Sequence, residues 1–233
     1  MGIGMRYARV EQQLEEACQQ AGRRRQDVTL VAVSKTVGLD EVDQAIKAGA
    51  HAFGENRPDE LLRKQAAFPQ AQWHFIGNVQ SRRIKDIVSA ASLIHSVCKP
   101  EHLPKIDHAA REAGKVQPVL LEVNVSGEES KSGLAPDQVL EVALEAASLP
   151  NVELRGLMTM APRGDAQVAS DTFAGLRALR DRLQEQLELR APGVSLSELS
   201  MGMSEDWPEA VAEGSTMVRV GRAIFSPEFE PEA

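Results

Sequence analysis

The chain has 233 residues, of which 42% are hydrophobic and 26% charged, and its formal net charge is −8. Because acidic residues outnumber the scattered basic ones, we expect no nucleic-acid partner. The two cysteines lie far apart, and neither they nor the five histidines have metal-site spacing, so we expect no metal. No signal-peptide core or bilayer-length apolar run is evident, which predicts a cytoplasmic protein without a membrane partner.

An amphipathic helix is predicted first, over residues 5–21. Eight strand-like segments follow in alternation with helical ones, and this alternation implies a parallel sheet. The predicted strands cover residues 28–33, 51–54, 73–76, 93–97, 119–125, 152–160, 196–200 and 217–220. The clearest predicted helices between them cover residues 39–48, 100–113, 136–147 and 166–189.

Eight strand–helix units favour an α/β fold, a single (β/α)8 TIM barrel with an extra N-terminal helix. An open doubly wound sheet is the alternative, but no G-x-G-x-x-G motif follows the first strand. We therefore predict one barrel domain over residues 1–233, in which residues 226–233 form a mobile acidic tail.

Lys35 follows an apolar run, residues 28–34, at the point where a buried strand would open into a loop. We expect the amine there to be partly desolvated, which would help it lose its proton and attack an aldehyde. The structural alternative is a lysine that simply returns the chain to water.

Polar residues also follow the last two predicted strands, and loops at these positions of a barrel often hold phosphate. Ser200 and Ser204 offer hydroxyl groups, and Gly221 allows close backbone approach. Asp206 and Glu209 have the spacing of a capping box at the next helix start, whose amide groups would favour an anion. Ordinary turn residues are the alternative interpretation.

Arg219 is predicted on the opposite face of the last strand from Val218 and Val220. If that face is the barrel interior, the guanidinium must meet a carboxylate or a ligand acceptor. An ion pair is the structural alternative, and donation to a cofactor ring nitrogen is the functional one.

Ordered motifs run along most of the chain: VAVSKT at 31–36, FGENR at 53–57, WHFIG at 73–77, GLM at 156–158, LSMGMS at 199–204 and VRVG at 218–221. Asn124-Val125 with Glu129, Lys131 and Gly133 adds another. Together they resemble the pyridoxal phosphate homeostasis protein family, which is similar to the N-terminal domain of alanine racemase. The resemblance implies pyridoxal 5'-phosphate (PLP) held as an internal aldimine on Lys35. It places the phosphate at Ser200, Ser204, Gly221 and Arg222, the ring nitrogen at Arg219, and the ring near Asn56, His74 and Met158.

The resemblance further implies a monomer that serves vitamin B6 homeostasis and delivers PLP to PLP-dependent apo-enzymes, without established catalytic turnover. An arginine at the ring nitrogen would leave the pyridine neutral and a poor electron sink, which agrees with weak catalysis. A low-activity amino-acid racemase is the alternative, although the single tyrosine, Tyr7, lies in the first helix and is interpreted as a packing residue. A Schiff-base aldolase acting on sugar phosphates is a third hypothesis. Pro58-Asp59 departs from the family pattern, so the helix start there is expected to differ slightly.

Overall fold

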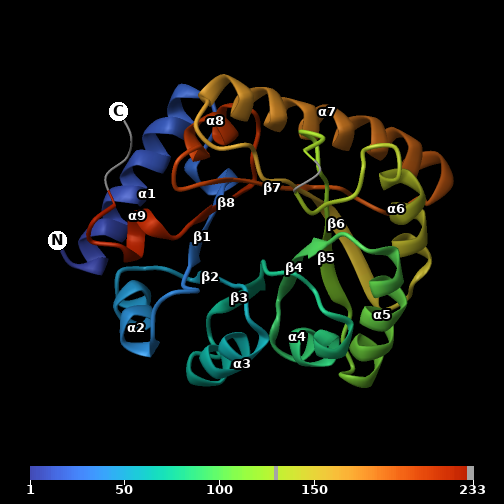
Figure 1. Cartoon of the computed structure of the whole chain (residues 1–233), viewed down its shortest axis with the longest axis horizontal. Helices are drawn as coiled ribbons and strands as arrows, with labels where there is room; N and C mark the ends of the chain where they lie inside the picture. The colour runs from blue at the N-terminus through green and yellow to red at the C-terminus, as the bar shows by residue number, and fades with distance from the viewer. Residues whose placement is uncertain (129–130, 230–233) are drawn as a thin grey trace.

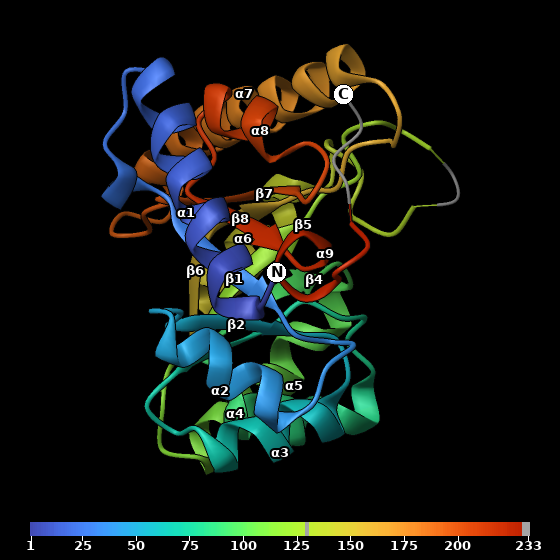
Figure 2. The same ribbon diagram turned by 90° about the vertical axis from the view of Figure 1, so that its left-hand side faces the viewer.

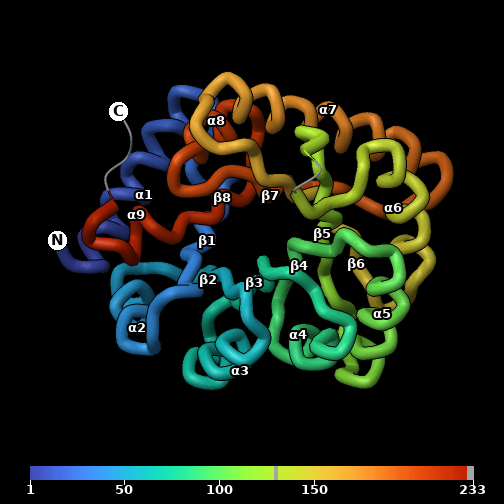
Figure 3. The backbone as a smooth tube through the Cα atoms, in the orientation of Figure 1, coloured from blue at the N-terminus to red at the C-terminus, as the bar shows by residue number. Residues whose placement is uncertain are grey.

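The computed structural model describes residues 1–128 and 131–229. Glu129 of the family resemblance and the last four residues of the predicted tail lie outside the described residues. Eight parallel strands pair in chain order, and β1 also pairs with β8, so the sheet closes into a barrel. Figure 1 shows the strands surrounded by helices, and the tube in Figure 3 runs from the blue β1 round to the red β8. The predicted (β/α)8 barrel is therefore confirmed.

All eight predicted strands are present, and their boundaries differ from the predicted ones by only a few residues. They are β1 (Thr29–Val33), β2 (Ala52–Glu55), β3 (Gln72–Phe75), β4 (Leu93–Val97), β5 (Gln117–Glu122), β6 (Val152–Met158), β7 (Glu198–Met203) and β8 (Met217–Val220).

The larger helices alternate with the strands. They are α1 (Ile3–Gln20), α2 (Leu39–Lys47), α3 (Pro58–Ala67), α4 (Ile84–Ala90), α5 (Leu103–Glu112), α6 (Val139–Ser148), α7 (Ala166–Arg190), α8 (Trp207–Ala212) and α9 (Arg222–Phe225). Short 3-10 turns cover Arg25–Asp27, Ser81–Arg83 and Pro100–His102. No helix in the described ranges is both long and apolar enough to cross a membrane.

The N-terminal helix α1 is the extra element predicted ahead of the barrel. It buries a stripe that includes Tyr7, Val10, Leu14 and Cys18, at the spacing expected of one helix face. Helix α1 lies beside α2, α8 and α9, as Figures 1 and 2 both show. Burying a side chain such as Leu14 contributes about 1.5–3 kcal/mol.

The barrel interior has an apolar layer with a polar layer next to it, toward the carboxyl ends of the strands. The apolar layer consists of Val31, Ala52, Leu93, Leu120, Met158 and Met217. Side chains two residues further along a strand point to the same face. Alternation therefore brings Glu122 and Arg219 into the interior above Leu120 and Met217, as predicted for Arg219 from its strand.

The start of α3 carries the departure from the family pattern. Pro58 occupies the first turn of α3, where a missing N–H costs little, and Asp59 lies in the same turn. Asp59 pairs with Arg83, which follows β3 in the chain. The substitution is therefore compatible with a helix that begins directly after the β2 loop.

Candidate functional site

Lys35 lies two residues beyond the end of β1, at the carboxyl-end rim of the barrel, and its side chain is exposed. The expectation of a partly desolvated amine is therefore wrong for this structure, because the loop after β1 leaves the side chain open to solvent. The residue before it, Ser34, is completely buried. Lys35 is thus an exposed residue that follows directly on a buried one.

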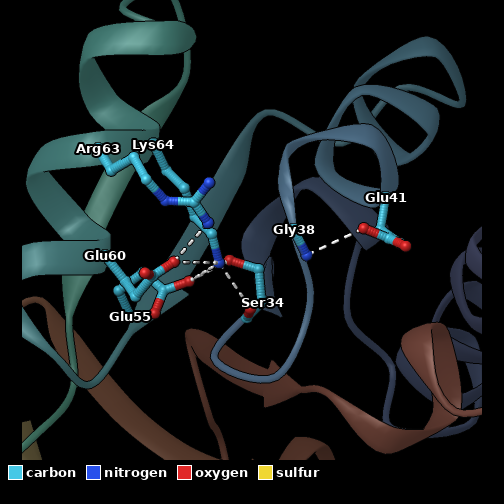
Figure 4. A network of polar contacts seen from close by, with 7 residues as sticks. All are labelled: Ser34, Gly38, Glu41, Glu55, Glu60, Arg63 and Lys64. Atoms are coloured by element: carbon cyan, nitrogen blue, oxygen red, sulfur yellow. Dashed lines mark hydrogen bonds and ion pairs between the residues drawn. The ribbon is translucent and has the colours of Figure 1, made fainter.

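A buried ion pair lies directly behind this position (Figure 4). Lys64 Nζ, from α3, lies 2.6 Å from Glu55 Oε1 at the end of β2, and both side chains are 0% exposed. Lys64 also donates to the carbonyl oxygen of Ser34 at 2.8 Å, and the Ser34 hydroxyl donates to the same Glu55 oxygen at 2.6 Å. Charges removed from water are stable only when they are paired and hydrogen-bonded in this way. The pair therefore fixes the peptide from which Lys35 projects.

The far side of the loop after Lys35 is also fixed. The backbone N–H of Gly38 donates to Glu41 Oε2 at 2.9 Å, which caps the start of α2 (Figure 4). The loop that carries Lys35 is therefore anchored at Ser34 and at Gly38.

Arg219 points into the barrel and is only 5% exposed. Its Nη1 donates to Ser200 Oγ at 2.6 Å, and its Nη2 donates to the carbonyl oxygen of Thr159 at 3.0 Å. Burial lowers the pKa of Arg219 to about 10, an effect opposed by the nearby charges of Asp206 and Glu122. Within the described residues Arg219 forms no ion pair, so the predicted structural alternative is wrong, and a buried cation faces neutral acceptors.

Two buried histidines continue this polar layer. His95 Nδ1 lies 2.8 Å from Ser200 Oγ, and His95 Nε2 lies 2.9 Å from His74 Nδ1. Burial, together with a smaller effect of the nearby His51, lowers the pKa of His74 to about 4, and burial also holds the pKa of His95 well below its usual value. Both rings are therefore neutral near pH 7.

A second group of donors lies where β7 and β8 end. Ser204 Oγ accepts hydrogen bonds from the backbone N–H groups of Gly221, at 3.3 Å, and Ala223, at 3.5 Å. A Cβ at Gly221 would lie 3.2 Å from the carbonyl oxygen of Val33, so the end of β8 lies against the end of β1. A hydroxyl and two amides thus gather beside the strand that leads to Lys35.

The loop between β7 and α8 differs from its predicted form. Asp206 does not cap α8; its carboxylate accepts from the backbone N–H of Met203 and so closes the turn after β7. Glu209 Oε2 is buried without a hydrogen-bond partner in the described structure. The predicted capping box is therefore wrong, because the local turn takes the Asp206 carboxylate.

The other predicted residues lie at two levels of the barrel. Asn56 is exposed directly after β2, with the loop after β3 so close that a Cβ at Gly77 would lie 2.1 Å from its carbonyl oxygen. Arg222 pairs with Glu205 at the outer edge of the rim. Met158 is buried in the apolar layer. Lys35, Asn56, Ser204, Gly221 and Arg222 therefore lie at the rim, with Ser200, Arg219, His74 and Met158 below it.

Sequence reasoning missed three residues of this arrangement: Lys64, His95 and Thr159. Lys64 lies three residues after Leu61 on the buried face of α3, a position at which a lysine signals an internal partner. His95 lies two residues after Leu93, on the interior face of its strand, which alternation alone could have indicated. No sequence pattern indicates that the backbone carbonyl of Thr159 accepts a hydrogen bond from Arg219.

Comparisons with known proteins identify the family of this chain. Residues 7–228 match the family described as alanine racemase, N-terminal domain. The pyridoxal phosphate homeostasis protein of Aquifex aeolicus is 38% identical over 223 residues, which cover 94% of this chain and 96% of that protein. The protein of the same name from Deinococcus radiodurans is 41% identical over 214 residues, or 91% of this chain and 96% of that one.

Solved structures of other proteins have a similar fold. PipY of Synechococcus elongatus, solved with PLP bound, has a TM-score of 0.84 at 36% identity and covers 96% of this chain and 100% of its own. Alanine racemase of Clostridium difficile shares the fold, with a TM-score of 0.73 at 15% identity over 95% of this chain and 56% of that enzyme. This chain therefore belongs to the alanine racemase N-terminal domain family, among the pyridoxal phosphate homeostasis proteins.

Proposed function

We propose that this protein binds PLP covalently through Lys35 and acts in PLP homeostasis, as a reservoir that holds and releases the cofactor. The observation that carries the proposal is that Lys35 and Arg219 come from neighbouring elements, since Lys35 follows β1 and Arg219 lies on β8. Because β1 and β8 pair with Val31 beside Arg219, both residues belong to the same sector of the barrel. The names of the relatives and the PLP in PipY support the assignment.

The residues at the site fit the three functional groups of PLP. The Lys35 amine suits the aldehyde, and the buried Arg219 suits an uncharged ring nitrogen because it lacks a carboxylate partner. Ser204 with the amides of Gly221 and Ala223 suits a phosphate. We assign Asn56, His74 and Met158 to the surroundings of the ring, and Arg222 to the edge of the phosphate site.

The charge on Arg219 favours storage over catalysis. With a pKa of about 10, its guanidinium remains protonated near pH 7 and can only donate to a ring nitrogen. When bound, PLP would supply an electrophilic aldehyde, but a ring without a proton on its nitrogen withdraws electrons weakly. Reactions that need a stabilised carbanion are therefore expected to be slow.

Racemisation would also need a second acid or base on the opposite side of the bound amino acid. Tyr7 does not fit this role, since it is 2% exposed within α1 and its hydroxyl donates to Glu11 at 3.0 Å. Burial raises the pKa of Tyr7 as well. We therefore rank the racemase hypothesis second.

The exposed Lys35 also suits exchange of the cofactor with other amines. We propose PLP-dependent apo-enzymes as recipients and a cytoplasmic monomer as the working form. Cys18 and Cys98, which form no disulfide in the described structure, support a reducing compartment.

The test is transfer of PLP from the loaded protein to an apo-aminotransferase, in the presence of a phosphatase that destroys free PLP. We expect the wild type to restore aminotransferase activity and Lys35→Ala to restore none. A wild-type protein that keeps no PLP after gel filtration would contradict the proposal. Loss of optical activity from L-alanine, dependent on Lys35, would instead support the racemase.

A further inference from the structure

A continuous line of hydrogen-bonded side chains crosses the barrel interior from β8 to β3. It runs from Arg219 through Ser200 on β7 and His95 on β4 to His74 on β3, with contacts of 2.6, 2.8 and 2.9 Å. All four side chains are at least nine-tenths buried. Burying a polar group raises the free energy of the folded state unless the group forms a hydrogen bond. The four side chains therefore satisfy one another's hydrogen-bonding groups in the core.

The direction of each hydrogen bond follows from the groups involved. Arg219 can only donate, so Ser200 Oγ accepts from it. The hydroxyl hydrogen of Ser200 then needs an acceptor, and in the described structure that acceptor is His95 Nδ1. A neutral His95 must therefore carry its proton on Nε2 and donate to His74 Nδ1, which in turn places the His74 proton on Nε2.

The line holds the guanidinium of Arg219 from one side, while the Thr159 carbonyl holds it from the other. Neither acceptor is charged, and within the described residues Arg219 forms no ion pair with the nearby Asp206 and Glu122. A guanidinium fixed in one plane by two neutral acceptors can present those N–H groups to a further acceptor in a defined direction.

We propose that Ser200, His95 and His74 are positioning residues that hold Arg219 in the orientation in which it meets a ring nitrogen. The inference rests on the proposed function, because Arg219 has this task only when PLP binds. In this arrangement the Ser200 hydroxyl belongs to the buried line, and Ser204 provides the hydroxyl for the phosphate. The resemblance alone would place both serines at the phosphate.

The test compares PLP with an analogue in which a C–H group replaces the ring nitrogen. The wild type should bind PLP at least about tenfold more tightly than the analogue, the effect of one hydrogen bond to a charged group. Ser200→Ala should reduce this ratio to near one, because Arg219 loses one of the two acceptors that fix its plane, while affinity for the analogue stays within about twofold.

Two further variants make the test specific. His95→Asn keeps an acceptor near the position of Nδ1 and should retain most of the ratio, whereas His95→Phe should lose it. His108→Phe is the matched control, since the His108 side chain is 60% exposed on α5, and its ratio should equal that of the wild type. If Ser200→Ala fails to fold, the contrast between His95→Phe and His95→Asn still tests the line.

Each outcome separates one assumption from the others. If Ser200→Ala and His95→Phe kept the wild-type ratio of affinities for PLP and the analogue, the positioning role of Ser200 and His95 would be overturned. An equal loss of affinity for PLP and for the analogue in these variants would overturn it as well. Equal binding of both ligands by the wild type would overturn the contact between Arg219 and the ring nitrogen. Failure of the wild type to bind PLP at all would overturn the proposed function itself.

Discussion

Lys64 Nζ donates to the carbonyl oxygen of Ser34 at 2.8 Å, so a buried ammonium on α3 holds the residue that precedes Lys35. The partner of this ammonium, Glu55, ends β2, whereas Ser34 directly follows β1. Three elements are therefore tied together at the point where Lys35 leaves the barrel (Figure 4). A lysine that must meet one aldehyde carbon benefits from such a fixed origin.

Lys64→Met should lower the free energy of unfolding by about 3–5 kcal/mol, because it leaves the buried Glu55 carboxylate without its ion-pair partner, with only the Ser34 hydroxyl still donating to it. Arg63→Met is the matched control on the same helix, since Arg63 pairs with Glu60 and its side chain is 46% exposed. Arg63→Met should lower the free energy of unfolding by less than about 1 kcal/mol. Urea unfolding followed by circular dichroism measures both, and equal losses would contradict the role of the buried pair.

The double variant Glu55→Gln/Lys64→Met tests whether the pair also positions Lys35. Its stability should recover toward that of the wild type, because no charge remains buried alone. The rate of covalent attachment of PLP should nevertheless stay below the wild-type rate, since the Ser34 carbonyl has lost its donor. Stopped-flow absorption measures this rate, and full recovery of both quantities would show that the pair serves stability alone.

Acid should weaken the protein through His74. Its pKa is about 4 in the folded state, against 6.5 when unperturbed, so between these values the unfolded chain binds the additional proton. Stability is therefore fully present above pH 6.5 and falls as the pH drops toward 4, by up to about 3 kcal/mol from this residue. Urea unfolding of the PLP-free protein at pH 7.0, 5.5 and 4.5 should show the fall. His74→Gln should show a smaller one, and identical slopes would contradict the assignment.

Gly202 is expected to tolerate no side chain. Its φ is +92°, and a Cβ there would lie 2.6 Å from the Ala210 Cβ on α8. Gly22 also has positive φ, +67°, but nothing lies within 4 Å of its Cβ position, so Gly22→Ala measures the backbone cost alone, about 1–2 kcal/mol. Gly202→Ala should cost clearly more in thermal unfolding, and equal costs would show that α8 can move away.

Ser204→Ala should weaken PLP binding by about tenfold, because a hydroxyl that gathers two amides is removed from the phosphate site. Binding of pyridoxal, which has no phosphate, should not change. Ser148→Ala on the exposed surface of α6 is the control. Equal effects of Ser204→Ala on PLP and pyridoxal in a fluorescence titration would place the phosphate elsewhere.

Much of the fold is predictable because its strands are short apolar runs with distinct ends. The β4 segment, for example, was predicted with the boundaries that it has. The predicted extension of the fifth strand to residue 125 is wrong, since regular pairing ends at Glu122 and Val123 bridges to Leu134 instead. A helix start was expected near Pro58-Asp59 without a predicted end, and α3 begins at Pro58.

The candidate site was likewise predictable only in part. Alternation sufficed to turn Arg219 inward. The choice of Lys35 as the lysine that holds PLP came from the motifs and stays a prediction. The contact between His95 and Ser200 could not be predicted, because the two residues lie 105 positions apart on strands that do not pair. Which side chains meet across a barrel depends on strand stagger, and the irregular registers of β4 with β5 and β7 with β8 shift it locally. The exposure of Lys35 likewise depends on a loop conformation that no residue pattern fixes.

The central claim is that Lys35 holds PLP, and borohydride reduction of the PLP-loaded protein followed by peptide mass mapping tests it most directly. Reduction converts a lysine-bound aldehyde into a stable secondary amine that survives digestion. We predict the phosphopyridoxyl group on the peptide that contains Lys35, together with loss of the visible absorption band. The group on another lysine, or an unmodified protein, would contradict the claim.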